Sequence, residues 1–234
     1  MGRLFSKGAL VFEIGACIGD MVAGFLAHGA GWVVAVEPEK EDVEYMRKRF
    51  QGNGAVILRT AAAGPEMGTA ILHINKGARS CSTLVPDIAW GEDTQLRGME
   101  VHERRSVPMI TLDHLISTYG MPDYINITAV RFEYQTLCGL SQPVPHLAFA
   151  VTHATIDEGW AEKAIDRIIE ISPNASFNYA NRSVLSRDGR DHAAPLRWAS
   201  WKGAENIKKI LPEVNEQGLW GSICVRMIGR IPNG

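Results

Sequence analysis

Two glycines and an acidic residue near the start of the chain have the spacing of a site for a nucleotide-like ligand. Residues 12–20 read Phe-Glu-Ile-Gly-Ala-Cys-Ile-Gly-Asp, and Gly15 and Gly19 allow the backbone to turn sharply and to approach a ligand closely. An apolar run over residues 33–36 then ends at Glu37, which follows Gly15 by 22 residues. A glycine-rich strand-to-helix turn and the acid that binds a ribose are typically about 20 residues apart. A carboxylate at this position can accept hydrogen bonds from both ribose hydroxyls.

The charge at this turn favours a cationic ligand over a dinucleotide. Gly15 and Gly19 form a Gly-x-x-x-Gly pair, without the closer G-x-G-x-x-G set that brings backbone amides onto a pyrophosphate. Glu13 lies near the end of the first predicted strand, where its charge would repel a diphosphate. A ligand that carries an amino group and a sulfonium suits this carboxylate better, which indicates S-adenosylmethionine. A nicotinamide-dependent oxidoreductase would need the closer glycine set and residues for hydride transfer, and the sequence shows neither.

A sheet must hold the glycine turn and Glu37 in place, and the hydrophobic pattern predicts one. Apolar runs of strand length alternate with runs of helical spacing, which indicates repeated β-α-β units. The predicted strands cover residues 9–14, 32–37, 55–60, 124–128, 147–152, 176–180 and 220–227. The predicted helices cover residues 19–29, 40–50, 111–119, 132–139, 159–171 and 204–212, and Thr111 is the expected cap of the third. Short β-like pieces predict an insertion over residues 68–109, and such segments often shape substrate pockets.

Several segments resemble one known family. They are residues 11–20, 34–38, 62–68, 80–84, 111–113, 132–134 and 137–140. In this order, between about residue 10 and residue 155, they are similar to the FkbM-type methyltransferases. The resemblance implies an α/β, Rossmann-like class I methyltransferase fold with a mostly parallel seven-stranded sheet and an antiparallel last strand. It also implies S-adenosylmethionine as the cofactor and O-methylation of a hydroxyl on a sugar or secondary metabolite.

The resemblance implies two groups of site residues at the carboxyl ends of the strands, where open α/β sheets bind their ligands. The residues expected at the cofactor are Glu13, Gly15, Ala16, Gly19, Asp20, Glu37, Pro38 and Ala62. We expect the glycines and Ala16 beneath the methionine portion and Glu37 at the ribose. Glu13 and Asp20 would interact with the polar end of the methionine portion. The residues expected at the methyl acceptor are Ser80, Ser82, Thr83, Asn126, Thr128 and Arg131.

The sequence departs from the family pattern where acids are expected near the acceptor. Around the fourth strand the family pattern is close to Lys-x-Asp-x-Glu-Gly, and another Glu follows the fifth strand. The matching residues here are Asn126, Thr128, Val130, Arg131 and Ala150. Three acids are therefore missing, which leaves two interpretations: a methyltransferase with a different acceptor or base, or a protein that binds the cofactor with weak or absent transfer. His153 and Glu133 are the candidate replacement bases, since His and Glu commonly remove protons in catalysis.

The composition limits the classes of partner. With 234 residues and 46% hydrophobic content, the chain can bury one sizeable core, and we expect a single domain over residues 1–234. A net charge of −2 gives no broad basic surface, so we expect a small-molecule or glycan acceptor and no nucleic acid. No run of about 18 apolar residues occurs, so we expect no membrane partner. The four cysteines are scattered and form no C-x-x-C pair, which indicates a reduced cytoplasm, no disulfide framework and no metal site.

Overall fold

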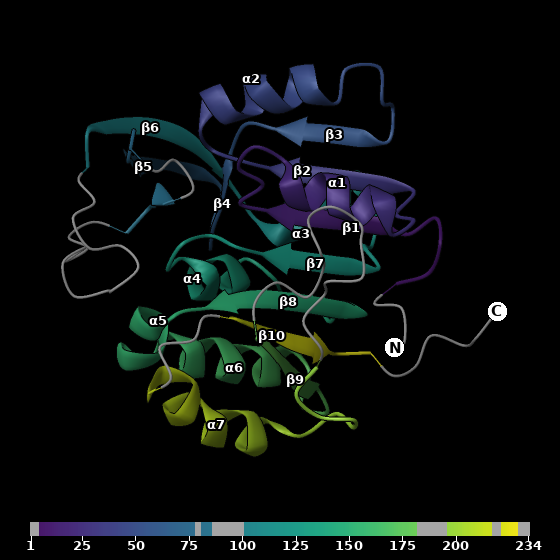
Figure 1. Cartoon of the computed structure of the whole chain (residues 1–234), viewed down its shortest axis with the longest axis vertical. Helices are drawn as coiled ribbons and strands as arrows, with labels where there is room; N and C mark the ends of the chain where they lie inside the picture. Colours follow the sequence, from purple (N-terminus) through teal and green to yellow (C-terminus); the bar gives the residue numbers. More distant parts are fainter. Residues whose placement is uncertain (1–4, 78–80, 86–100, 182–195, 217–220, 229–234) are drawn as a thin grey trace.

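A seven-stranded sheet forms the centre of the molecule (Figure 1). The computed structural model describes residues 5–77, 81–85, 101–181, 196–216 and 221–228. The strands of this sheet are β1 (Leu10–Ile14), β2 (Trp32–Val36), β3 (Val56–Arg59), β7 (Tyr124–Ile127), β8 (His146–Val151), β9 (Ser176–Asn181) and β10 (Gly221–Arg226). Their order is β3-β2-β1-β7-β8-β10-β9, and β10 runs antiparallel to both of its neighbours while the other pairs are parallel. The arrangement confirms the expected Rossmann-like class I methyltransferase fold with an antiparallel last strand.

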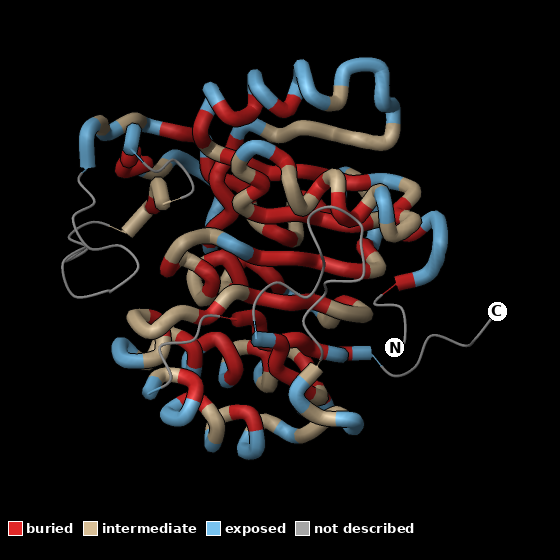
Figure 2. The backbone as a smooth tube through the Cα atoms, in the orientation of Figure 1, coloured by how far each residue is buried: buried red, intermediate tan, exposed pale blue. Residues whose placement is uncertain are grey.

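Helices cover both faces of this sheet. They are α1 (Asp20–Ala27), α2 (Lys40–Arg49), α3 (Leu112–Tyr119), α4 (Glu133–Cys138), α5 (His153–Asp157), α6 (Trp160–Ile171) and α7 (Ala204–Glu216). Because side chains alternate along a strand, every strand sends residues to both faces. On one face, Phe25 of α1 and Met46 of α2 pack in a single cluster with Val33 of β2. Figure 2 shows the result for α2, whose buried stretches face the sheet and whose exposed stretches face away from it.

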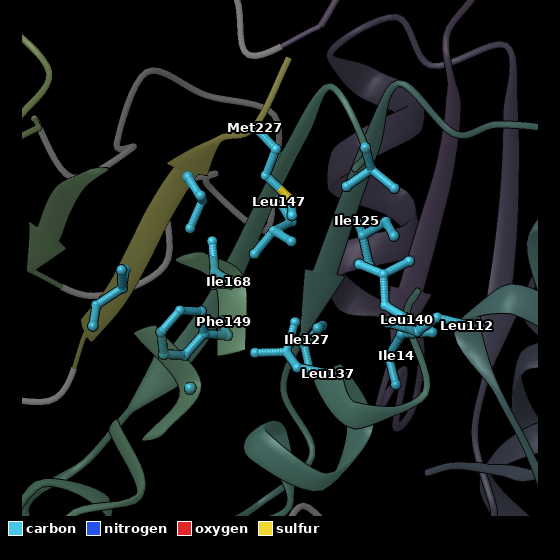
Figure 3. Packing of buried hydrophobic residues seen from close by; sticks show 14 of the residues in the cluster. Ile14, Leu112, Ile125, Ile127, Leu137, Leu140, Leu147, Phe149, Ile168 and Met227 are labelled. Atoms are coloured by element: carbon cyan, nitrogen blue, oxygen red, sulfur yellow. The ribbon is translucent and has the colours of Figure 1, made fainter. Parts of the chain in front are cut away.

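The other face carries the larger apolar core. Leu115 of α3, Ile168 of α6 and Leu211 of α7 belong to one cluster there. Ile125 of β7 and Phe149 of β8 join the same cluster from the sheet, and Figure 3 shows them together with Ile168. Since the strands are packed from both sides, their carboxyl ends have fixed positions at one edge of the sheet, where a ligand can be held.

A second, three-stranded sheet lies near the carboxyl ends of the parallel strands (Figure 1). It consists of β4 (Ala62–Ala63), β5 (Gly68–Ile74) and β6 (Glu103–Ile110), in the order β4-β6-β5. β5 pairs antiparallel with β6, and β4 pairs parallel with β6. β5 and most of β6 fall within the predicted insertion over residues 68–109, of which residues 78–80 and 86–100 lie outside the described part. The extent of the insertion and of the single domain stays a prediction.

Most predicted elements are present, with small shifts at their ends. Thr111 caps α3 as predicted, because its hydroxyl accepts a hydrogen bond from His114 N at 3.0 Å. The pattern does not predict β4 or α5, which are too short to give a periodic signal. The helix predicted over residues 204–212 is longer in the structure, where α7 continues past Pro212 to Glu216. It continues because Val214 also packs in the core, so burial of the last turn outweighs the hydrogen bond that proline removes. None of the helices in the described ranges is long and apolar enough to cross a membrane.

Candidate functional site

A pocket opens where β1, β2 and β7 end beside the small sheet, and the space within its mouth and lining, open solvent included, is about 520 Å³. Of the residues predicted at the cofactor, the lining contains Gly15, Glu37, Pro38 and Ala62. Of the residues predicted at the acceptor, it contains Ser82, Thr83 and Thr128. Ser80, also predicted at the acceptor, lies outside the described residues.

The turn after β1 depends on Gly15, which lies in the left-handed region with φ 81°. Its amide donates a hydrogen bond to Val36 O at 2.9 Å, and the amide of Ala16 donates to the same oxygen at 3.2 Å. A Cβ atom at Gly15 would lie 2.1 Å from Thr128 O, so a side chain does not fit between β1 and β7 at this point. Gly19 also has a left-handed backbone, with φ 83°, and directly precedes α1. Gly19 and Ala16 shape the turn but are not among the described lining residues.

Glu37 is buried at the end of β2, and backbone amides hold both of its carboxylate oxygens. Cys17 N donates to Oε2 at 2.8 Å, and Glu39 N donates to Oε1 at 2.8 Å. The pKa of Glu37 is raised to about 7, chiefly by burial and in part by the charge of Asp42, while the two amide hydrogen bonds act in the opposite direction. A carboxylate oxygen accepts more than one hydrogen bond, so each oxygen of Glu37 can still accept one from a ligand hydroxyl.

Glu13, predicted at the cofactor, lies within β1 and is not among the described lining residues. Its side chain is 1% exposed, and Glu13 pairs in register with Asn126 of β7. Within the described part of the chain, its Oε2 has no hydrogen-bond partner. Burial raises the pKa of Glu13 well above its usual value, and a hydrogen bond from the Asn126 side chain opposes this rise. Asn126 Nδ2 also donates to Thr128 Oγ1 at 3.2 Å, so Asn126 links Glu13 to the lining and is not itself part of it.

The turn after β7 has an unusual backbone. Val130 and Arg131 both lie in the left-handed region, with φ 41° and 68°. Such a conformation costs on the order of 1–3 kcal/mol for each non-glycine residue and persists only where the surroundings hold it. Arg131 stands where the family pattern has its glycine, and its buried guanidinium forms an ion pair with Glu158. Val130 lines the pocket, whereas Arg131, predicted at the acceptor, is not among the described lining residues.

Glu133, predicted as a base, is the first residue of α4 and is buried behind this turn. Its Oε1 accepts a hydrogen bond from Ala129 N at 3.0 Å. Burial raises the pKa of Glu133 to about 7, while backbone hydrogen bonds and the charge of Arg131 act in the opposite direction. The carboxylate is therefore bound to the backbone of the turn, and Glu133 is not among the described lining residues.

Residues 81–85 bridge the pocket between the segments that follow β2 and β7. Ser82 Oγ donates a hydrogen bond to Glu39 Oε2 at 3.0 Å. Thr83 Oγ1 donates to Val130 O at 2.7 Å. Because Ser82 and Thr83 both line the pocket, these bonds place two hydroxyl groups at fixed positions beside it.

Two predicted residues, Asp20 and His153, have side-chain partners outside the described pocket lining. Asp20 accepts a hydrogen bond from Arg49 of α2 at 2.7 Å. His153 Nδ1 lies 2.9 Å from Asp157 Oδ2, and Asp157 also accepts a hydrogen bond from Asn215 of α7. This side of α5 thus meets α7, and neither Asp20 nor His153 is among the described lining residues.

The lining suits binding more than proton transfer. Ala61, Ala63 and Leu72 supply apolar surface. Among the described lining residues, the titratable side chains are Glu37 and Cys17. Burial and a nearby carboxylate raise the pKa of the Cys17 thiol to about 12, so the thiol stays protonated at neutral pH. In the described ranges, no group of three or more His, Cys, Asp or Glu residues could hold a metal ion.

Some lining residues carry little sequence signal. Cys17 contributes a backbone amide, which any residue type can supply, although its place between Gly15 and Gly19 marks it as part of the turn. Leu72 and Leu84 reach the pocket from the small sheet and the segment after it. Their position depends on contacts between distant parts of the chain, which a local pattern does not encode.

Comparison with known proteins identifies one family. The sequence matches the family described as the methyltransferase FkbM domain over residues 13–186. No curated protein matches the sequence significantly.

Solved structures are similar to the chain at a low level. Spermidine synthase from Thermotoga maritima is 11% identical with a TM-score of 0.46, covering 97% of this chain and 55% of that one. An rRNA methylase from Streptococcus thermophilus is 10% identical with a TM-score of 0.43, covering 96% of this chain and 90% of that one. SMU.1697c from Streptococcus mutans, in complex with SAH, is 10% identical with a TM-score of 0.43, covering 96% of this chain and 91% of that one.

Proposed function

Because the chain belongs to the FkbM family of methyltransferases, we propose that its pocket binds S-adenosylmethionine and that the protein methylates a hydroxyl group of a small molecule or glycan. The family and the fold are those of S-adenosylmethionine-dependent methyltransferases. The acceptor that we propose is a sugar or a secondary metabolite. We expect no nucleic-acid or membrane partner and a cytoplasmic location.

The fixed carboxylate of Glu37 is the observation that carries the proposal. The amides of Cys17 and Glu39 hold its two oxygens at 2.8 Å each, so the group is aligned before a ligand arrives. A ribose has two adjacent hydroxyl groups, and each can donate a hydrogen bond to one carboxylate oxygen. These bonds would be strong because the group is buried and water competes little for it.

Other features of the pocket fit the remaining parts of the cofactor. Gly15 leaves space beside Thr128 that a Cβ atom would fill. The apolar surface of Ala61, Ala63 and Leu72 suits the faces of an adenine ring. The described lining contains no Lys or Arg, which suits a cationic sulfonium better than a phosphate.

When bound, S-adenosylmethionine supplies a methyl group on a sulfonium. The task of the protein is then to hold an acceptor hydroxyl in line with that group and to exclude water. Ser82, Thr83 and Thr128 are the lining residues that we propose as acceptor contacts. The hydroxyl hydrogens of Ser82 and Thr83 already bond to protein oxygens, so these two side chains would accept a hydrogen bond from the acceptor.

A second candidate function is cofactor binding with weak or absent transfer. One observation favours it: among the described lining residues, the titratable groups are Glu37, which we assign to the ribose, and the protonated thiol of Cys17. A hydroxyl acceptor gains rate from a base within hydrogen-bond reach, and this lining offers none.

A methyl-transfer assay with radiolabelled cofactor and a panel of sugars and hydroxylated metabolites separates the two functions. Turnover supports the first, and cofactor binding without turnover on any acceptor supports the second. If His153 is the base as predicted, His153→Ala should lower turnover and leave cofactor affinity unchanged. Equal loss of turnover and affinity would reject that role.

Calorimetric titration with S-adenosylhomocysteine tests the cofactor site. Glu37→Ala should weaken binding by about 1.5–3 kcal/mol, or roughly 10- to 150-fold in Kd, because hydrogen bonds to a charged group are lost. Glu44→Ala removes the same charge from an exposed position of α2 and should leave Kd unchanged. Absence of binding to the wild type, or equal losses in both variants, would reject the proposed site. Binding of NAD in place of S-adenosylhomocysteine would favour an oxidoreductase.

A further inference from the structure

Residues 128–131, the turn after β7, form one wall of the pocket. Three of these residues, Thr128, Ala129 and Val130, line it. β1 lies between β2 and β7 in the sheet, so this turn and Glu37 lie on opposite sides of the Gly15 turn. The conformation of the turn therefore sets the width of the pocket across from the carboxylate.

The turn is held from two directions. From α4, Glu133 Oε1 accepts a hydrogen bond from Ala129 N at 3.0 Å. From residues 81–85, Thr83 Oγ1 donates to Val130 O at 2.7 Å. The first bond holds Ala129, the residue directly before the two with positive φ angles, and the second holds Val130, the first of those two.

The turn needs such support because its backbone is unfavourable. Val130 has φ 41° and Arg131 has φ 68°, and L side chains rarely adopt either value. Glu133 is 6% exposed, so water competes little for its carboxylate. A buried carboxylate that accepts backbone amides is a strong hydrogen-bond acceptor and can fix a turn that would otherwise relax.

We propose that Glu133 is a positioning residue for the cofactor pocket: its carboxylate holds the turn over residues 128–131, with Val130 and Arg131 in the left-handed region, so that the turn forms the wall opposite Glu37. This role differs from the predicted one, in which Glu133 is a base. The expected effect of Glu133 on ligand affinity rests on the proposed function. The hydrogen bond by which Glu133 holds the turn does not depend on any ligand.

Amide hydrogen exchange on the ligand-free protein tests the hold directly. In Glu133→Ala the amide of Ala129 loses its acceptor, and it should exchange about tenfold faster or more than in the wild type. Glu133→Gln keeps one acceptor oxygen and should give an intermediate rate. Unchanged exchange at Ala129 in Glu133→Ala would overturn the proposal.

A matched pair of substitutions at Arg131 tests the backbone argument. Arg131→Gly and Arg131→Ala both remove the ion pair with Glu158, but only glycine adopts φ 68° without steric cost. Adding Glu133→Ala should raise the Kd of S-adenosylhomocysteine about tenfold in the Arg131→Ala background and less than about threefold in the Arg131→Gly background. Equal increases in the two backgrounds would overturn the proposal.

The remaining outcomes also decide the question. Loss of methyl transfer in Glu133→Ala with unchanged affinity would make Glu133 a base and overturn the positioning role. A lower Tm with unchanged affinity would leave Glu133 a purely structural residue, which also overturns it. If the wild type binds no S-adenosylhomocysteine, the proposed function fails, and exchange at Ala129 still decides whether Glu133 holds the turn.

Discussion

If S-adenosylmethionine binds at Glu37 as proposed, we expect its binding to depend on pH. The pKa of Glu37 in the free protein is raised to about 7, chiefly because burial disfavours the charged form. Ligand hydroxyls bond best to the charged carboxylate, so protonation of Glu37 competes with binding. We expect the Kd of S-adenosylhomocysteine to rise as the pH falls below about 7, approaching tenfold per pH unit, and titration calorimetry measures this. In Glu37→Gln the Kd should be weaker but nearly independent of pH, and a slope like that of the wild type would contradict the assignment.

The stability of the free protein should respond to pH in the opposite direction. The pKa values of Glu37 and Glu133 in the folded state are both raised to about 7 from the ordinary 4.5. The folded state thus binds these protons more tightly than the unfolded chain does. Their contribution to stability is complete below the ordinary value and is lost as the pH rises through the folded value. The Tm without ligand should therefore fall as the pH rises from about 4.5 to about 7, and by less in Glu37→Gln.

Residue positions could be predicted where one β-α-β unit contains them. Gly15 and Glu37 follow neighbouring parallel strands of a single unit, so their spacing along the chain places both at the same edge of the sheet. Asp20 and His153 also follow predicted strands closely in the sequence, so the same reasoning placed them at this edge. Asp20 pairs with Arg49 of α2, whereas His153 pairs with Asp157 of its own helix, which in turn bonds to Asn215 of α7. Side-chain direction depends on such partners, and a local pattern does not reveal them.

At the scale of elements, the large sheet was predictable because burial on both faces gives continuous apolar runs. The bridge formed by residues 81–85 was not. Its two side-chain bonds join Ser82 to Glu39 and Thr83 to Val130, which are 43 and 47 residues apart in the sequence. A short polar turn has no hydrophobic periodicity, so the sequence does not indicate which distant residues it contacts.

Thr83 allows the contribution of this bridge to be measured. Thr83→Val keeps the shape of the side chain but removes the donor to Val130 O and the acceptor for Val85 N. Because one hydrogen bond contributes about 0.5–1.5 kcal/mol, we expect the Kd of S-adenosylhomocysteine to rise roughly two- to tenfold. Thr83→Ser keeps the hydroxyl and should retain the affinity of the wild type. If both variants bind equally weakly, the methyl group matters and the hydrogen bond does not.

At the scale of the whole molecule, the order of the strands depends on more than local pattern. Periodicity finds strands but does not say which strands pair, and the order came instead from the family resemblance. The antiparallel β10 lies between β8 and β9 although it follows both in the sequence. Burial explains the arrangement, since Ile223 of β10 packs in the same cluster as Phe149 of β8 and Phe177 of β9.

The two apolar clusters share the same strands, so we expect them to unfold together. Val33 and Val34 are neighbours on β2, yet Val33 belongs to the cluster that contains Phe25 and Val34 to the cluster that contains Ile168. Phe25→Ala and Ile168→Ala, each at a fully buried position, should each lower the free energy of unfolding by about 2–5 kcal/mol. Tyr45→Ala, at a half-exposed position of α2, should change it by about 0.5 kcal/mol or less.

Thermal unfolding followed by near- and far-ultraviolet circular dichroism checks this expectation. Each core substitution should move one transition, with the same midpoint in both signals, because loss of either cluster exposes strands that the other cluster needs. Two transitions, one shifted by Phe25→Ala and the other by Ile168→Ala, would mean that the faces unfold independently. The predicted single domain would then be wrong, and the pocket, which draws residues from strands packed by both clusters, would depend on two separate folding units.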